Sequence, residues 1–99
     1  MEQTAINVEQ FISALNQGVV EFDFLKENGD FRTAKGTRNV KTILELSGAK
    51  PADYYEEAFS NNEDAEPILF FDVERGAIRS VLSNTIVPRV VFRDVVFLN

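Results

Sequence analysis

The chain has 99 residues, and its 16 acidic against 10 basic side chains give a formal net charge of −6. This length fits one domain with a modest core, and 44% hydrophobic residues with nine phenylalanines indicate a folded protein rather than a disordered one. The sequence has no cysteine, which excludes disulfides and thiolate metal sites, and no histidine, the commonest general base and metal ligand. The acidic balance argues against a general nucleic-acid binder and permits a basic partner.

The N-terminus and the hydropathy pattern indicate the compartment. Met1 to Ala5 has neither the basic region nor the apolar run of a signal peptide. No apolar run approaches the roughly 18 residues that a membrane-spanning helix needs. We therefore expect a cytoplasmic protein that does not contact a membrane.

A short helix is predicted from Asn7 to Gly18. Asn7 is a favourable N-cap, Gln10 stands where a capping box has Glu or Gln, and Gly18 is a favourable C-terminal stop. Its apolar stripe, spaced i, i+3, i+4 and i+7, consists of Val8, Phe11, Ile12 and Leu15. A single stripe cannot hold so short a helix in water, so the helix must dock on a sheet.

Val19 to Arg38 predicts a β-hairpin. Two alternating runs flank Asn28-Gly29, and both residues accept the positive φ that a two-residue type I′ turn needs. Such a loop pairs Lys26 with Phe31. The register then places on one, core-like face Val20, Phe22, Phe24, Phe31 and Thr33. It places on the solvated face Glu21, Asp23, Leu25, Arg32, Ala34, Gly36 and Arg38. On that face Glu21 and Asp23 would neutralise Arg32 and Arg38.

The chain from about residue 40 to 67 forms an insertion after this hairpin. Asn39 to Ala49 suits either a helix or an irregular crossing segment. Pro51 at a first helical position and Asp53 in a first turn predict a second helix. Ser60 to Pro67 is polar and acidic, which is typical of an exposed loop.

A second hairpin and a final strand region are predicted next. Ile68 to Val73 is an apolar run of strand length, Ala77 to Leu82 is its partner, and Gly76 suits the left-handed position of a three-residue loop. Arg89 to Leu98 is β-branched and aromatic, which predicts one or two more strands. An exposed edge in that stretch could pair with a second copy and give a homodimer. Antiparallel hairpins in so short a chain favour a small barrel or a strongly bent sheet.

Two stretches carry a resemblance to a known family. The first comprises Val20 to Phe24, Asn28 to Asp30, Arg32, and Ala34 to Asn39; the second is Phe70 to Val81. Together they resemble the small SH3-like β-barrel proteins that are common in tailed-phage genomes and related mobile elements. The resemblance implies a barrel. With the elements predicted above, the expected fold is mostly β, a small SH3-like antiparallel barrel with an N-terminal helix and a helical insertion, in one domain over residues 1–99. The insertion is longer than the family leads one to expect. The resemblance also implies a phage setting but no activity, because a fold does not fix a function.

Acidic and aromatic residues of the insertion are candidates for binding a protein. No Lys or Arg occurs between Lys50 and Arg75. The simplest interpretation of this stretch is a solvated acidic surface without a binding role. The segment Asn61 to Glu66 lacks the ligand spacing and central glycine of a calcium loop, so we predict no metal and no cofactor. Two adjacent tyrosines on a helix cannot both face the core, so one should be available to a partner. The candidate protein-binding residues are Tyr54, Tyr55, Glu56, Glu57 and Asp64.

A basic strip from Lys26 to Lys41 is the alternative candidate. Its aromatic neighbours suit single-stranded nucleic acid, which small barrels bind in this way, although ordinary cross-strand pairing also accounts for the charges. The candidate nucleic-acid-binding residues are Arg32, Lys35 and Arg38. Arg79 suits a structural role in which its guanidinium bonds carboxylates or loop carbonyls.

The sequence carries no motif for catalysis. It has no nucleophile elbow, phosphate-binding loop, dinucleotide fingerprint or zinc motif, so we expect a protein that is not an enzyme. The favoured function is a non-catalytic phage-type protein that engages a host or phage protein, one with a basic patch, through the acidic insertion surface. The alternatives are a nucleic-acid-binding module that uses the basic strip, and an oligomer that sequesters a small ligand or nucleotide between barrels.

Overall fold

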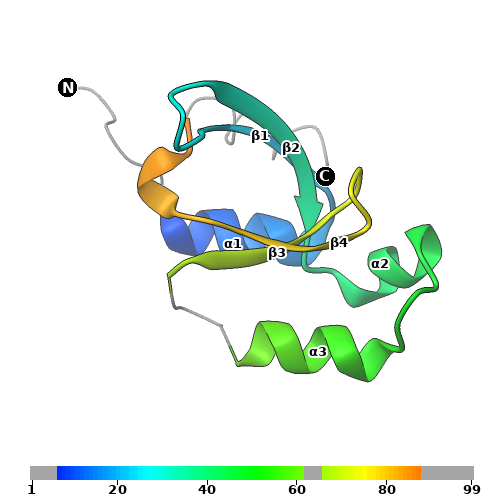
Figure 1. Ribbon diagram of the computed structural model, residues 1–99. Helices are drawn as coiled ribbons and strands as arrows, with labels where there is room; N and C mark the ends of the chain where they lie inside the picture. Colours follow the sequence, from blue (N-terminus) through cyan, green and yellow to red (C-terminus); the bar gives the residue numbers. More distant parts are fainter. Residues whose placement is uncertain (1–6, 62–65, 88–99) are drawn as a thin grey trace.

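The computed structural model describes residues 7–61 and 66–87 (Figure 1). Its elements are α1 (Val8–Gln17), β1 (Val20–Leu25), β2 (Phe31–Thr37), α2 (Val40–Leu46), α3 (Ala52–Ser60), β3 (Ile68–Asp72), β4 (Ala77–Val81) and the 3₁₀ turn η1 (Ser83–Thr85). The strands form one antiparallel sheet in the order β1-β2-β3-β4. The sheet curls so that β1 and β2 arch over β3 and β4, and α1 lies across the opening of the curve (Figure 1). The strands predicted within Arg89 to Leu98 lie outside the described residues.

Helix α1 begins and ends as predicted. The Asn7 side chain accepts a hydrogen bond of 3.0 Å from the Gln10 N–H, which satisfies a donor that the first turn leaves without a helical partner. Gly18 follows the last helical residue, and its N–H donates to the Ala14 carbonyl at 3.2 Å. The Gly18 φ of 173° is extended rather than left-handed, so the helix stops there without the predicted glycine conformation.

The first hairpin differs from the prediction by one residue. The Lys26 N–H donates to the Asp30 carbonyl at 2.8 Å, and the Gly29 N–H donates to the Lys26 carbonyl at 3.0 Å, so the loop contains three residues. Gly29 has a φ of 92°, whereas Asn28 has a negative φ, which excludes the type I′ turn. The predicted two-residue turn and the pairing of Lys26 with Phe31 are therefore wrong, since Gly29 alone supplies the left-handed residue that closes a three-residue loop.

This shift moves the residues of β2 to opposite faces, because side chains alternate with a period of two. Phe24 lies across from Arg32 rather than Thr33, and Phe22 lies across from Ala34. The concave face of the first hairpin consists of Val20, Phe22, Phe24, Arg32, Ala34 and Gly36. Thr33 lies on the other face, where its hydroxyl donates to Asp23.

The sheet has a hydrophobic core on each face. The concave face packs against α1, and its buried residues are Phe11, Ala14, Leu15, Val20, Phe22, Ala34, Ile68, Phe70, Val81 and Ile86. The convex face packs against α2 and α3 through Ile43, Tyr55, Phe59 and Phe71. Phe70 and Phe71 are neighbours on β3 and point to opposite faces, so this strand belongs to both cores.

The insertion between β2 and β3 is helical, as predicted. The ambiguous segment after Asn39 is helix α2, and the Asn39 side chain caps it by accepting from the Thr42 N–H at 2.9 Å. Helix α3 begins one residue later than predicted, with Pro51 as its N-cap. In the second hairpin Gly76 has the predicted left-handed conformation, with a φ of 70°. Its loop contains four residues between Asp72 and Ala77 rather than the predicted three.

The chain after β4 turns back toward β1. Ile86 forms an isolated antiparallel bridge with Phe24, and the Val87 N–H donates to the Asp23 carbonyl at 2.9 Å. This contact brings the chain that follows β4 to the free edge of β1. The described sheet nevertheless stays open, so of the predicted alternatives, a small barrel or a strongly bent sheet, the described residues form the bent sheet.

Gly36 allows the close approach of β2 to Phe70, and its replacement gives a test of the concave core. A Cβ at this position would overlap the Phe70 ring. We expect Gly36→Ala to lower the free energy of unfolding by about 1–3 kcal/mol, the usual cost of overpacking, as measured by urea denaturation. Gly48→Ala is the matched control, because a Cβ there meets no atom within 4 Å. Equal stability of the two variants would contradict this packing.

Candidate functional site

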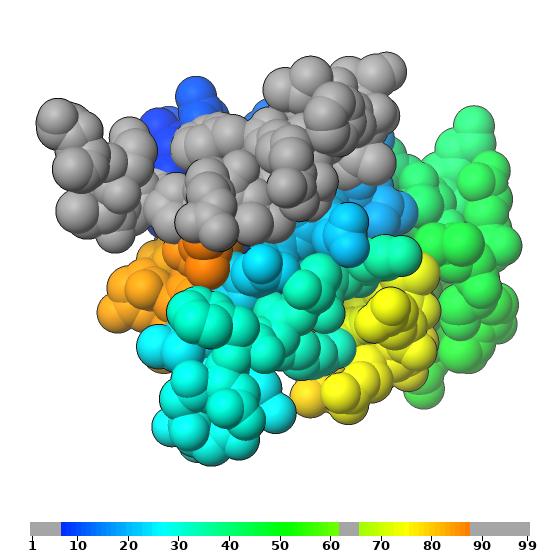
Figure 2. All heavy atoms as spheres, turned by 90° about the horizontal axis from the view of Figure 1, so that it is seen from above, coloured from blue at the N-terminus to red at the C-terminus, as the bar shows by residue number. Residues whose placement is uncertain are grey.

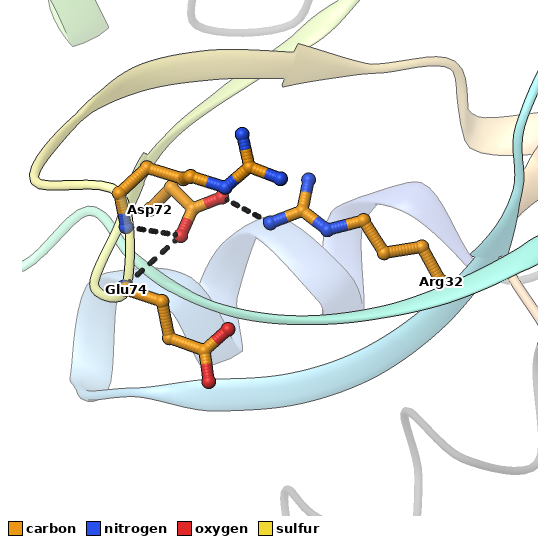
Figure 3. A network of polar contacts seen from close by, with 4 residues as sticks. Arg32, Asp72 and Glu74 are labelled. Atoms are coloured by element: carbon orange, nitrogen blue, oxygen red, sulfur yellow. Dashed lines mark hydrogen bonds and ion pairs between the residues drawn. The ribbon is translucent and has the colours of Figure 1, made fainter.

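Asp72 is the centre of a polar network at the end of β3. Its side chain is fully buried. One carboxylate oxygen accepts the backbone N–H groups of Glu74 and Arg75, at 3.0 Å each, and thereby shapes the β3–β4 loop. The other oxygen accepts from Nη2 of Arg32 at 2.8 Å (Figure 3). The ion pair thus joins the first hairpin to the loop of the second.

Arg32 is held in place on the concave side of the sheet. Its guanidinium carbon lies 5.8 Å from the centroid of the Phe24 ring, and its side chain is 18% exposed. The bond to Asp72 uses one of five N–H donors, and the described residues supply no hydrogen-bond acceptor for the others. Arg32 therefore presents oriented donors toward solvent.

A pocket of about 330 Å³ opens beside this ion pair. Its lining residues are Phe24, Lys26, Arg32, Phe70, Arg75, Arg79 and Ser80. Two of its cations come from the first hairpin and two from the second, so four of the ten Lys and Arg side chains of the chain meet here. Figure 2 shows the first hairpin, in cyan, between the yellow second hairpin and the orange η1. We call this hollow the basic pocket.

The register explains why arginines line the pocket. Arg32 lies across from Phe24, and Arg79 lies across from Phe70, so both belong to the concave face. The residues two positions farther from each hairpin loop on that face, Ala34 and Val81, are buried in the core. The concave face is therefore apolar where α1 covers it and cationic nearer the hairpin loops.

The lining of the basic pocket contains no carboxylate, and Asp72 is the one described ion-pair partner of its cations. Counting Asp72 with the four cations gives 4 − 1 = +3 in a chain of net charge −6. Within residues 7–61 and 66–87, Lys26, Arg75 and Arg79 have no ion-pair partner. The structural bonds that the sequence suggested for the Arg79 side chain are likewise absent from the described part of the chain.

The predicted basic strip does not form one surface. Arg32 faces the pocket, whereas Lys35 is exposed on the opposite face of the hairpin. Arg38 is only 5% exposed, and its Nε donates to the Leu69 carbonyl at 2.8 Å. Its guanidinium also lies 5.3 Å from the Phe59 ring centroid. Of the three nucleic-acid candidates, only Arg32 therefore contributes to the basic pocket.

The predicted neutralisation across the first hairpin is wrong. Glu21 lies across from Lys35, and Asp23 lies across from Thr33. Arg32 instead bonds Asp72, a residue 40 positions away. The error follows from the register, because the predicted two-residue loop placed Arg32 on the solvated face.

The two candidate tyrosines of α3 point in different directions. Tyr54 is 47% exposed, and the Lys50 ammonium lies 5.3 Å from its ring centroid. Tyr55 is 2% exposed and packs edge-on against Phe71 at 5.7 Å between centroids. The expectation that one tyrosine faces the core and the other solvent is confirmed, and Tyr55 belongs to the convex core rather than to a contact surface.

The remaining acidic candidates are only partly described. Glu56 and Glu57 are exposed on α3, and Asp64 lies outside the described residues. Within the described ranges no three Asp, Glu, His or Cys side chains cluster so as to hold a metal ion. The same ranges contain no helix with the length and apolar character to cross a membrane.

Sequence reasoning missed Arg75 and Arg79 as members of the pocket. Both are far from Lys26 and Arg32 in sequence, so no local pattern connects them. The alternation of side chains in the second hairpin could have indicated Arg79, because it places this residue on the concave face opposite Phe70.

These features define a mostly β domain with a curled four-stranded antiparallel sheet and helices on both faces. Residues 8–87 match the WYL_2 family model, which describes a Sm-like SH3 beta-barrel fold. Because the match spans most of the chain, the protein belongs to this family. The predicted mostly β, SH3-like fold is confirmed, whereas closure of the sheet into a barrel is not observed within the described residues. No curated protein and no solved structure matches the chain.

Loss of the Asp72 charge should destabilise the protein. Asp72→Asn keeps an oxygen for the loop N–H groups but removes the charged acceptor of Arg32. We expect a loss of about 1.5–3 kcal/mol in the free energy of unfolding, the range for a hydrogen bond to a charged group, as measured by urea denaturation. Glu57→Gln, an equal charge change at an exposed site of α3, should change stability by less than about 0.5 kcal/mol. Similar losses in both variants would contradict the role of Asp72.

Proposed function

We propose that this protein is a non-catalytic binding module that holds a phosphate-bearing anion in its basic pocket. The observation that carries the proposal is the convergence of four cations from two hairpins on one pocket of an acidic chain. Like charges brought together repel one another and lower stability. An anion bound among these cations supplies negative charge beyond that of Asp72, their one described ion-pair partner.

The chemistry of the lining suits phosphate. Guanidinium groups bind phosphate oxygens through paired N–H donors, and lysine adds a point charge. Arg32 is already oriented by Asp72 and Phe24, so less entropy is lost when it binds. The lining includes no imidazole and no carboxylate that could act as a general base. These features support binding rather than catalysis.

Removing single cations should weaken binding of inorganic pyrophosphate. We expect Arg79→Gln and Lys26→Gln each to raise its dissociation constant by about 10-fold or more, because each deletes a charge-assisted contact. Isothermal titration calorimetry measures the effect. Both residues are exposed, so the variants should keep the fold and the melting temperature.

Lys35→Gln is the matched control for these two variants. It removes the same charge from the opposite face of the hairpin, so it should change the dissociation constant by less than about twofold. The proposal is wrong if pyrophosphate does not bind, or if Lys35→Gln weakens binding as much as Arg79→Gln.

A second candidate function is engagement of a protein partner through the insertion. Its exposed large apolar side chains are Leu44, Leu46 and Tyr54, at 40%, 52% and 47% exposure, and Glu56 and Glu57 are exposed on the same helix as Tyr54. Aromatic anchors with a charged rim are typical of protein interfaces, and the acidic residues suit a basic patch on the partner. The resemblance to phage barrels supports a host or phage protein as that partner, in the cytoplasm or in the host cytosol.

The insertion surface can be tested by comparing two exposed aromatic residues. A partner captured by the wild-type protein from the lysate of its own host should be lost with Tyr54→Ala, because the anchor side chain is removed. Capture should persist with Phe31→Ala, whose side chain is 68% exposed on the first hairpin. Equal recovery by both variants, quantified by mass spectrometry, would refute a role for this surface.

A further inference from the structure

A second hollow adjoins the basic pocket. It measures about 380 Å³, and its lining residues are Phe24, Leu25, Lys26, Glu27, Pro67, Ser80, Val81, Leu82 and Thr85. Three of these residues, Phe24, Lys26 and Ser80, also line the basic pocket. The two hollows therefore share a wall formed by β1, β4 and the start of the first loop, and a ligand of moderate length can occupy both.

The second hollow differs from the first in chemistry. Most of its wall is apolar, with Leu25, Pro67 and Leu82 added to the Phe24 ring. Leu25 and Leu82 are 41% and 50% exposed, so covering them would remove apolar surface from water. A cationic hollow beside an apolar hollow suits a ligand with a charged end and a ring at the other end.

We infer that the two hollows together bind one nucleotide, whose phosphates lie among the cations and whose base lies against Phe24, Pro67 and Leu82. This inference rests on the proposed function of the basic pocket. An anion the size of phosphate leaves the second hollow unfilled, whereas each hollow has the volume of a typical small-molecule site. Lys26 lines both hollows, so one ligand that occupies both can contact it.

Polar groups within the apolar hollow favour a base over a lipid tail. Glu27 is exposed without an ion-pair partner in the described part of the chain, and Lys26 adds a cation to the same lining. A hydrocarbon tail would cover these groups without hydrogen bonds, which is unfavourable. A nucleobase has a stacking face for Phe24 and polar edges for the Glu27 carboxylate.

The test compares pyrophosphate with the four ribonucleoside diphosphates by isothermal titration calorimetry on the intact chain. We expect at least one nucleoside diphosphate to bind 10-fold or more tightly than pyrophosphate. Leu82→Ser should abolish this advantage while the affinity for pyrophosphate stays within twofold. Arg79→Gln should weaken both ligands. Leu46→Ser, at a similarly exposed leucine on α2, should affect neither.

The outcomes separate this inference from the proposed function. Binding of pyrophosphate with no nucleotide binding more tightly overturns the inference and leaves the basic pocket as an anion site. Failure of pyrophosphate and nucleotides alike overturns both. A nucleotide advantage that survives Leu82→Ser overturns the placement of the base. A single-stranded oligonucleotide is tested as the last ligand. If the oligonucleotide binds and no mononucleotide does, the assignment to a free nucleotide is overturned.

Discussion

The ion pair between Arg32 and Asp72 is the interaction on which the arrangement of the two hairpins depends. Burying a carboxylate costs several kcal/mol unless charged and hydrogen-bonded partners compensate it. Here two backbone N–H groups of the β3–β4 loop and one guanidinium of β2 supply that compensation. The same contacts fix the loop, orient Arg32 and tie together strands that are 40 residues apart. One buried charge therefore sets both the local turn and the wall of the basic pocket.

The concave face of the sheet changes character along its length. Beneath α1 it is a close-packed aromatic core, where Phe22 meets Phe11 and Phe70 edge-on at centroid distances of 5.1 and 5.3 Å. Toward the hairpin loops α1 no longer covers it, and arginines occupy inward-facing positions. A curled sheet that is not closed within the described residues leaves this end open to solvent, so the cations can meet a ligand without the cost of full burial. The aromatic core and the basic pocket therefore lie at opposite ends of the same concave face.

The register of the first hairpin shows where prediction from sequence succeeded and failed. The existence of the hairpin, the cap at Asn7 and the turn at Gly76 follow from local backbone preferences and were correctly predicted. The length of the loop at Asn28-Gly29 was predicted wrongly, because two-residue and three-residue loops both use Gly29 in a left-handed conformation. The difference of one residue in loop length places Arg32 on the concave face, where it lines the basic pocket. The ambiguity of the segment after Asn39 had a similar cause, since α2 is short and is stabilised by packing against α3 and β3 rather than by its own propensity.

The fold class follows from local signals in the sequence. Its alternating runs, turn glycines and capping residues define a small antiparallel β domain with helices, because each of these signals acts over a few neighbouring residues. The absence of cysteine and histidine likewise limited its chemistry. Which charged side chains lie close together depends instead on contacts between distant parts of the chain. Lys26, Arg32, Arg75 and Arg79 come together because β1 and β4 approach across the curl of the sheet, and that approach depends on long-range packing that no local pattern specifies.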